Sequence, residues 1–405
     1  MMGLGYNLAI VLSRLSLIRY SPWLRRAIAV MTFVVAALAF PQAALAGISV
    51  SGNITSNTTW AVADSPITLT GPLLVDGGVT LTVEAGVTVD LNGHFIYVEG
   101  ALRAEGTPEA QVTFTGTAST GEGNFISFES SSTPWNADTG SGSLIDYSIV
   151  DMEPSGSDGA AIAIQQHSSE GPRIANSRIT STRDALMVVN KAIIEGNILS
   201  GSSQVLFHQG TEGATIRNNV FYGGSNGFIC GATPVEFQGN TLVGKGGGVG
   251  ITLRPHGGCN LGSTFENNTI VNYGTAVSLS AFGTSSNVSA VFRHNTFFGN
   301  DQLFTLVQAQ GTIDAISNWW GTSDTAAIET GMLHSADDFR LPTATYTPFL
   351  TTPHVSSPPL PPQDLAAQTG ASSISLAWSA NPEADITGYK LHWDTDDDGY
   401  PFTNS

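Results

Sequence analysis

The sequence predicts an all-β protein in which short strands stack as a solenoid. A phrase of the form apolar-x-Asn-x-apolar recurs through the middle of the 405-residue chain at spacings of 21 to 28 residues. Glycine is frequent, with 45 copies, and charged residues make up only 12%. This composition is typical of short strands joined by tight turns, and no amphipathic helix of useful length follows residue 46.

Seven asparagines mark the repeat. They are Asn176, Asn197, Asn219, Asn240, Asn268, Asn295 and Asn318. Strands this short cannot bury an apolar face alone, so successive coils must stack and place equivalent side chains above one another. Asparagine tolerates the left-handed backbone of a sharp turn, and its amide can bond the equivalent groups of neighbouring coils. We therefore predict an asparagine ladder along the turns.

A second apolar position follows most markers by about nine residues. It is occupied by Ala185, Leu206, Phe228, Val277 and Phe304, and it predicts a second strand in each coil. Upstream, residues 79–83, 87–91, 95–98 and 112–115 alternate apolar and polar side chains and predict the opening coils. The longer spacings carry Gly- and Ser-rich stretches at 244–250 and 283–287, which predict loops extruded from a coil.

Three stretches carry a family resemblance. They are GVTLTVEAGVTVDL at 78–91, LRAEGT at 102–107 and SNWWGT at 317–322. With the repeated asparagine phrases, they resemble the right-handed parallel β-helix repeat proteins of the pectin-lyase-like superfamily over residues 47–350. The resemblance implies a right-handed parallel β-helix with ligands bound in a groove outside the stacked strands, and indoles of Trp319 and Trp320 that cap the apolar stack. It does not choose an activity, because this solenoid carries lyases, hydrolases, epimerases, adhesins and inert surface proteins.

The first 46 residues predict a signal peptide. Four arginines precede an apolar run from 27 to 40, and Ala44-Leu45-Ala46 fits a cleavage site. The alternative is an uncleaved anchor, since the apolar run could just span a bilayer. We predict a mature chain from Gly47 with no membrane span, secreted or held at the cell surface.

The charge balance restricts the partners. The chain has 33 acidic and 15 basic residues, a net charge of −18, and removal of the signal peptide makes it more acidic still. Such a surface repels nucleic acid and anionic lipid, although acidity also serves solubility. We predict no nucleic-acid partner and an extracellular polysaccharide as the candidate ligand.

The two cysteines, Cys230 and Cys259, lie about one coil apart. In an oxidising compartment a single disulfide between them is the expected state.

The C-terminal part predicts a linker and a further module. Residues 351–362 are rich in Pro, Ser and Thr, which is typical of a semi-rigid linker. Residues 374–378 and 386–393 resemble strands of a fibronectin type III domain, with Trp378 and Tyr389 at its core positions. Because such a sandwich needs about seven strands and about 100 residues, the stretch 363–405 predicts a truncated domain, a partial β-sandwich.

Asp394, Asp396 and Asp398, followed by Gly399, match the first half of a calcium loop. The twelfth position of such a loop falls on Ser405 instead of glutamate, and the segment also fits an ordinary loop between strands. No cofactor is therefore predicted, with calcium as the alternative.

One set of charged residues is a candidate for polysaccharide cleavage. It comprises Asp146, Asp151, Asp158, Arg173, Arg183 and Asp184, from neighbouring coils. A lyase needs carboxylates that hold calcium and a basic group that removes a proton, whereas a hydrolase needs two opposed carboxylates, for which Asp146 and Asp184 are candidates. Aspartate and arginine also occur at the solvated turns of any solenoid, and this interpretation is favoured.

Arg254 and His256 form a second candidate set, for hydrogen bonds to sugar hydroxyls. They also fit a solvated surface loop, which is the favoured interpretation.

Two functions remain for the protein as a whole. The leading one is a carbohydrate-binding or structural, adhesive surface protein, and the alternative is a polysaccharide lyase or glycoside hydrolase. The sequence leaves open whether the protein is an enzyme.

Overall fold

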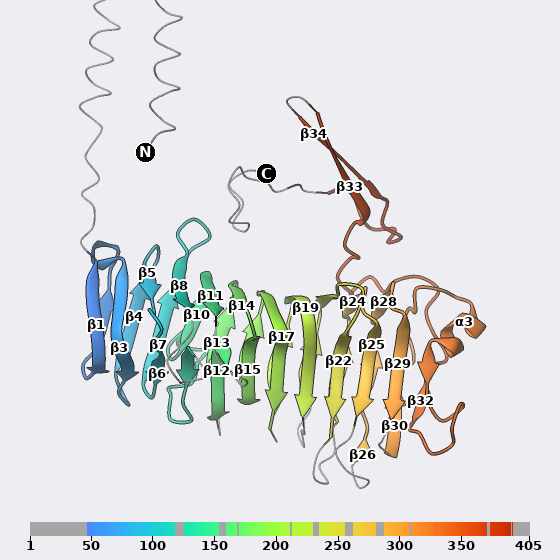
Figure 1. The fold of residues 1–405 in the computed structure, drawn as a ribbon. Coiled ribbons are helices and arrows are strands. Elements are labelled where there is room, and N and C mark those ends of the chain that lie inside the picture. The colour runs from blue at the N-terminus through green and yellow to red at the C-terminus, as the bar shows by residue number, and fades with distance from the viewer. Residues whose placement is uncertain are drawn as a thin grey trace, which may run out of the picture. The chain divides into compact units, whose positions relative to one another are not determined.

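The strands stack in parallel, coil upon coil, from one end of the solenoid to the other (Figure 1). The computed structural model describes residues 47–391, apart from 118–124, 154–158, 168–169, 211–212, 230–234, 256–261, 281–286, 308–309, 371–372 and 390. Within this part of the chain, the solenoid consists of two parallel sheets, which we call the larger and the smaller sheet. The prediction of an all-β solenoid is confirmed, and its form is a right-handed parallel β-helix.

The larger sheet has nineteen strands. They are β1 (Ile48–Ile54), β3 (Ile67–Val75), β5 (Thr88–Asp90), β6 (Ile96–Val98), β8 (Val112–Thr117), β9 (Ile126–Phe128), β11 (Ser148–Glu153), β12 (Ala160–His167), β14 (Arg178–Ser181), β15 (Asp184–Asn190), β17 (Ile198–Gln209), β19 (Val220–Ile229), β21 (Thr241–Val243), β22 (Val249–Arg254), β24 (Thr269–Val271), β25 (Thr275–Ser280), β28 (Thr296–Phe298), β29 (Gln302–Val307) and β31 (Met332–Leu333).

The smaller sheet has thirteen strands, most of them three residues long. They are β2 (Thr58–Trp60), β4 (Thr80–Glu84), β7 (Ala101–Glu105), β10 (Leu144–Asp146), β13 (Arg173–Ala175), β16 (Ile193–Glu195), β18 (Thr215–Arg217), β20 (Glu236–Gln238), β23 (Thr264–Glu266), β26 (Asn287–Val288), β27 (Val291–Arg293), β30 (Gln310–Asp314) and β32 (Thr343–Thr345).

The core follows from the alternation of these strands. In β13, β16 and β18 the middle residues Ile174, Ile194 and Ile216 are in register and fully buried. Their neighbours in β16 and β18 are partly or fully exposed, as the alternation of a strand requires. Further along, the equivalent Phe265 and Phe292 stack with ring centroids 4.6 Å apart. Identical positions of successive coils therefore form one continuous apolar column.

The predicted second strand is present as a separate strand in the coils of Ala185, Val277 and Phe304, whereas in the coils of Leu206 and Phe228 it is continuous with the first, as β17 and β19. All five of its marker residues, Ala185, Leu206, Phe228, Val277 and Phe304, lie in larger-sheet strands and are buried. The four opening segments correspond to β4, β5, β6 and β8.

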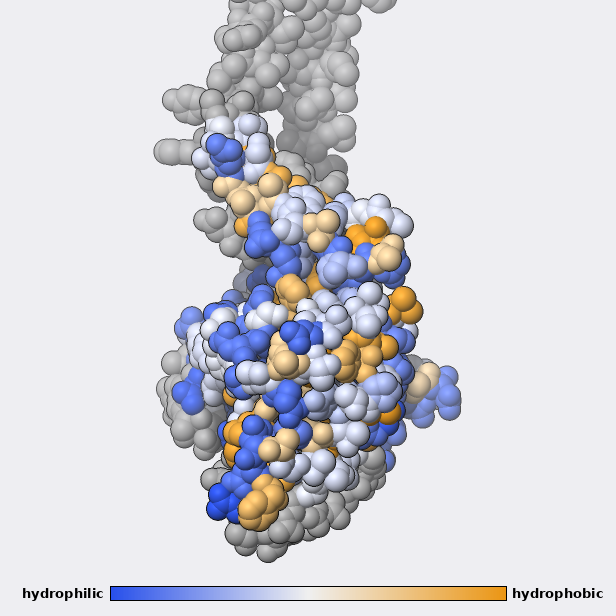
Figure 2. Space-filling model, turned by 90° about the vertical axis from the view of Figure 1, so that its right-hand side faces the viewer, coloured by the Kyte–Doolittle hydropathy of each residue, from blue (hydrophilic) through white to orange (hydrophobic). Residues whose placement is uncertain are grey.

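The last coil is closed by aromatic residues and by a short helix. Trp320 is buried and stacks on Phe297 at 4.6 Å, as the resemblance implied, whereas Trp319 stacks on Phe298 within a separate, smaller apolar cluster. Helix α3 (Thr325–Thr330) was not predicted, because six residues are too few for a helical period to appear. Figure 2 looks onto the side of the molecule at this end, where hydrophilic and hydrophobic residues are interspersed.

The segment predicted as a linker, residues 351–362, packs on the solenoid, and we call it the strap. Leu360 is 2% exposed and clusters with Val271 and Trp319. The Ser357 hydroxyl donates to the carbonyl of His294 at 2.6 Å, and the Thr269 hydroxyl donates to the carbonyl of Pro358. The strap is therefore held on the last coils by one buried apolar side chain and by hydrogen bonds to its backbone and side chains.

We expect Leu360→Ala to loosen the strap. Burial of a leucine side chain contributes about 1.5–3 kcal/mol, so its truncation weakens docking and opens the neighbouring Trp319 to solvent. Acrylamide quenching of tryptophan fluorescence should increase, with little change in the melting temperature of the solenoid. Val355→Ala is the control, because Val355 is 78% exposed. Equal quenching in wild type and Leu360→Ala would contradict the docking.

A small antiparallel sheet follows the strap. It consists of β33 (Gln363–Thr369) and β34 (Ile374–Ser379). The ring centroids of Trp378 and Tyr389, the two predicted core residues of a further module, lie 5.1 Å apart.

Helical structure is scarce in the described part of the chain. A short 3-10 helix, η1 (Val62–Asp64), is found in the opening coil. Among the residues that the structure describes, no helix is long and apolar enough to cross a membrane.

Candidate functional site

The asparagine ladder determines where the outward side chains lie. In five successive steps, the Nδ2 of one asparagine donates to the Oδ1 of the next at 2.9–3.1 Å. The members are Asn197, Asn219, Asn240, Asn268, Asn295 and Asn318, all at most 1% exposed. Each Oδ1 from Asn219 onward also accepts the backbone N–H of the preceding member. The ladder keeps consecutive coils in one register, so side chains outside the smaller sheet stand in straight rows.

The seventh predicted member, Asn176, lies outside the ladder, and this part of the prediction is wrong. Ser177 takes the ladder position, because its backbone N–H donates to Asn197 Oδ1 at 3.0 Å. Asn176 has a positive φ of 47° and donates to Asp146 Oδ1 at 2.8 Å. The turn has two successive positions that suit asparagine, one for left-handed backbone and one for the ladder, and spacing alone did not separate them.

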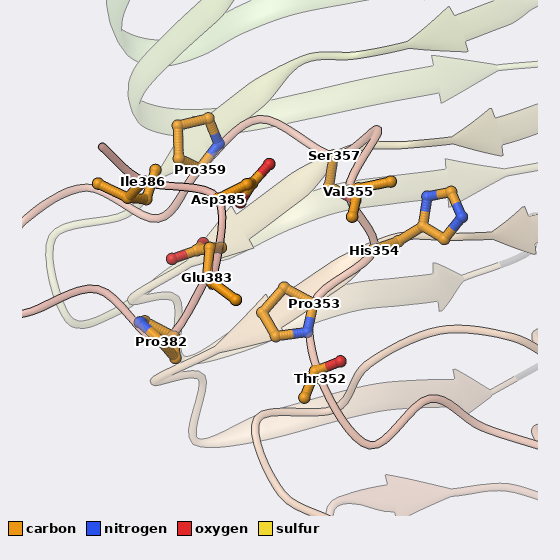
Figure 3. A pocket seen from close by; sticks show the side chains of 11 residues that line it. Thr352, Pro353, His354, Val355, Ser357, Pro359, Pro382, Glu383, Asp385 and Ile386 are labelled. Atoms are coloured by element: carbon orange, nitrogen blue, oxygen red, sulfur yellow. The ribbon is translucent and has the colours of Figure 1, made fainter. Parts of the chain in front are cut away.

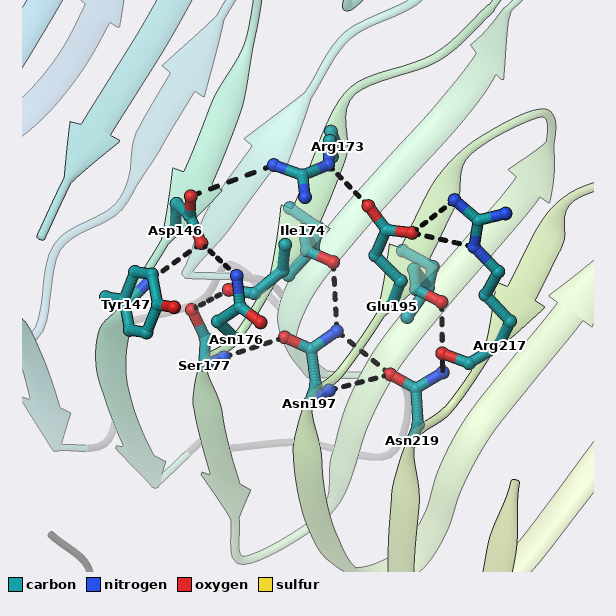
Figure 4. Close-up of polar contacts among 12 residues, drawn as sticks. Asp146, Tyr147, Arg173, Ile174, Asn176, Ser177, Glu195, Asn197, Arg217 and Asn219 are labelled. Atoms are coloured by element: carbon teal, nitrogen blue, oxygen red, sulfur yellow. Dashed lines mark hydrogen bonds and ion pairs between the residues drawn. The ribbon is translucent and has the colours of Figure 1, made fainter. Parts of the chain in front are cut away.

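A row of alternating charges lies on the outer face of the smaller sheet (Figure 4). Arg173 Nε contacts Glu195 at 2.7 Å, and its Nη1 lies 3.7 Å from Asp146. Arg217 approaches the other oxygen of Glu195 at 2.6 Å. The four residues come from the adjacent strands β10, β13, β16 and β18. The structure therefore brings together Asp146 and Arg173 of the predicted set and adds two residues that the sequence did not single out.

The electrostatics of this row favour the ionised form of Glu195. Burial of Glu195 opposes its ionisation, but the hydrogen bonds and charges of Arg173 and Arg217 outweigh burial and hold the pKa of its carboxyl below the usual value. Each carboxylate oxygen of Glu195 accepts from one of the two arginines. The row is thus a stable ion-pair network in which Glu195 is shared between two cations.

The remaining candidates for cleavage lie elsewhere. Asp151 is exposed on β11, while Asp184 begins β15 and accepts the backbone N–H of Gln204 at 3.0 Å. Arg183 lies in the turn just before Asp184. All three belong to the larger sheet or its turns. The strand β14 separates Arg183 and Asp184 from the smaller sheet, whereas Asp151 lies in β11, the larger-sheet strand that directly follows β10. Asp146 and Asp184, the candidate hydrolase pair, are therefore on different sheets.

Trp135 is the main feature of this face that the sequence did not predict as functional. Its loop, between β9 and β10, is fixed by a hydrogen bond from the backbone N–H of Trp135 to the carbonyl of Gly171 at 3.0 Å. The guanidinium carbons of Arg103 and Arg173 lie 5.8 and 5.6 Å from the centre of its ring. In β-sheet register, Arg103 on β7 and Arg173 on β13 both pair with Leu144 on β10, so the two cations that contact the indole come from the coils on either side of β10.

A pocket of about 510 Å³ opens beside this indole. It is lined by Thr133, Pro134, Trp135, Asn136, Ala137, Asp138, Ser141 and Glu170. A smaller pocket of about 240 Å³ lies further along the same sheet, between β20 and β23, and includes Glu236 and Glu266. The outer face of the smaller sheet thus carries two hollows along one row of coils.

A third pocket, of about 440 Å³, lies where the strap meets residues 382–386 (Figure 3). Its lining is rich in proline and includes His354, Glu383 and Asp385. Glu383 Oε1 accepts the backbone N–H of Leu360 at 2.7 Å. This carboxylate therefore anchors the strap.

Several predicted residues remain untested. Arg254 ends β22 and is half-buried. Asp158, Cys230, His256, Cys259, Asp394, Asp396 and Asp398 lie outside the described residues, so the disulfide, the loop site and the calcium loop stay predictions. Within the described ranges, no group of three or more His, Cys, Asp or Glu side chains is placed to hold a metal ion.

The geometry defines the class of protein as a right-handed parallel β-helix with a polar, hollowed outer face. The comparison with protein families agrees with this class: residues 160–325 match a family described as right handed beta helix region. That match spans less than half of the chain and begins beyond Trp135. Neither the curated proteins nor the solved structures gave a match.

Proposed function

We propose that this protein is a secreted or cell-surface β-helix that binds an extracellular polysaccharide without cleaving it. The observation that carries the proposal is the pocket beside Trp135, on a face where the register of the coils is fixed. A sugar ring presents apolar C–H faces and a rim of hydroxyl groups. An indole bordered by hydroxyl, amide and carboxylate groups complements both features. The stacked coils would let a polymer extend along the same face.

The state of the acidic residues favours binding over cleavage. A glycosidase needs one carboxyl that is protonated and a second that is free to attack or to activate water. Asp146 and Glu195 both lie against Arg173, and Asp184 accepts a backbone N–H in a turn of the larger sheet. Groups engaged in this way are suited to holding the scaffold rigid.

Export and the C-terminal module belong to the same proposal. We infer that residues 1–46 direct secretion and that β33 and β34 begin a fibronectin type III domain, for which the Trp378–Tyr389 contact is the support. A rigid solenoid that ends in such a module is suited to work on a surface or in a matrix, where it would hold a polymer at a fixed distance.

Affinity electrophoresis in gels containing soluble polysaccharides tests the binding. We expect the migration of the protein to be retarded by at least one polymer, and Trp135→Ala to weaken that affinity roughly tenfold, which corresponds to about 1.4 kcal/mol. Tyr222→Ala is the matched control, because Tyr222 is an aromatic residue that is 45% exposed on the larger sheet. Both variants should keep the wild-type melting temperature.

The same samples test the catalytic alternative. New reducing ends or unsaturated products that disappear in Glu195→Gln or in Asp184→Asn would make the protein an enzyme and overturn the non-catalytic proposal. Retardation that is unchanged in Trp135→Ala would move the binding site away from the pocket.

A further inference from the structure

We infer that the pocket beside Trp135 selects uncharged polysaccharide and rejects polymers of uronic acids. This inference rests on the proposed function and adds the chemical class of the ligand. It follows from three features of the outer face of the smaller sheet: the charges in the pocket, the partners of the two nearby arginines, and the acidic residues along the row.

The pocket contains carboxylates. Among the residues that the structure describes, its lining includes Asp138 and Glu170 but neither lysine nor arginine. Both carboxylates can accept hydrogen bonds from sugar hydroxyls, together with the side chains of Asn136 and Ser141. The carboxylate of a uronic acid would meet two like charges in the same hollow, and the described lining offers it no cationic side chain.

The two arginines at the indole are already engaged. Arg103 pairs with Glu105 and donates to the carbonyl of Gly142 at 2.9 Å. Arg173 lies between Asp146 and Glu195. An acidic sugar that bound either guanidinium would displace one of these carboxylates and leave it without its counter-charge on a partly buried face. An uncharged sugar needs no such exchange.

Acidic side chains also lie along the outer face of the smaller sheet on both sides of the pocket. Glu84, Glu105 and Asp146 are in register on three successive strands, β4, β7 and β10. Further along, Glu236 and Glu266 border the smaller pocket. A uronate chain laid along β4, β7 and β10 would run past three like charges, whereas the hydroxyl groups of an uncharged chain find acceptors there. Beyond β10 the row also carries arginines, but Arg173 and Arg217 are paired with Glu195.

The experiment compares uncharged polymers, namely xylan and soluble β-glucans, with polygalacturonate and alginate, by affinity electrophoresis of the purified protein at low ionic strength. We expect retardation by an uncharged polymer, its loss in Trp135→Ala, and no retardation by the uronates. The double variant Asp138→Asn, Glu170→Gln should gain measurable affinity for the uronates. The control double variant Asp151→Asn, Glu153→Gln removes two exposed carboxylates from the larger sheet and should gain none.

The outcomes separate this inference from the proposed function. Uronate binding by the wild-type protein that is lost in Trp135→Ala would overturn the selectivity and leave the binding function intact. An equal gain in both double variants would assign the rejection to net charge instead of to the pocket, and would overturn the inference as well. If no polymer retards the protein, the proposed function fails and the inference fails with it.

Discussion

Asn240→Ala is expected to lower the free energy of unfolding by roughly 2–4 kcal/mol, because it opens the ladder at its centre. Asn240 Oδ1 accepts both the backbone N–H and the Nδ2 of Asn219, and Asn240 Nδ2 donates to the carbonyl of Ile216 at 2.9 Å. Alanine leaves the buried N–H of Asn219 without an acceptor and the carbonyl of Ile216 without this donor. Chemical denaturation monitored by circular dichroism measures the loss.

Asn218→Gly provides the matched control one position before the ladder residue Asn219. Asn218 is exposed and has a positive φ of 56°, a conformation that glycine adopts without strain. We expect this variant to lose less than about 1 kcal/mol. Similar losses in the two variants would show that any asparagine of the turn matters equally, and an unchanged Asn240→Ala protein would remove the ladder as a source of stability.

The sequence predicted the scaffold well because stacking repeats the same physical requirement in every coil. The coils that contain Asn197, Asn219 and Asn240 each require an amide side chain at the same point of the turn. Asparagine therefore recurs in the sequence at a regular spacing. The exception, Asn176, lies where the ladder ends in Ser177, a residue with a shorter side chain that the marker phrase did not include.

The site was predicted only in part, because repeat counting places a residue in a coil but does not say which side of the coil it faces. Asp146 and Arg173 both lie in smaller-sheet strands and meet, whereas Asp184, from the same region of the sequence, begins a strand of the larger sheet. Trp135 lies in an insertion before the first asparagine marker, where no period gives its register. Its contact with Arg173 depends on how that loop folds back on the sheet, which local sequence does not encode.

A buried histidine leads to the second large effect, a loss of stability in mild acid. His208 is 1% exposed, and its Nε2 lies 3.0 Å from the carbonyl of Asn190. Burial lowers the pKa of His208 to about 4, although the hydrogen bond to Asn190 acts in the opposite direction. In the unfolded chain the same imidazole titrates with a pKa near 6.5, so the two states bind protons differently between those values.

Proton linkage gives the direction in which the free energy of unfolding changes with pH. Between about pH 6.5 and pH 4 the unfolded chain gains a proton at His208 that the folded chain does not accept, so the free energy of unfolding falls as the pH falls through this window. The contribution is fully present above pH 6.5. At about 1.36 kcal/mol per pKa unit, the loss approaches roughly 3 kcal/mol near pH 4.

His208→Gln isolates this contribution, because glutamine keeps an N–H donor for the carbonyl of Asn190 but does not titrate. Denaturation of both proteins between pH 4 and pH 8 should give a stability difference, wild type minus variant, that is constant above pH 7 and declines towards acid. His167, whose pKa burial also lowers, is present in both proteins and cancels in the difference. Parallel pH profiles would mean that His208 binds its proton equally well in the folded and the unfolded chain, and would contradict the predicted contribution.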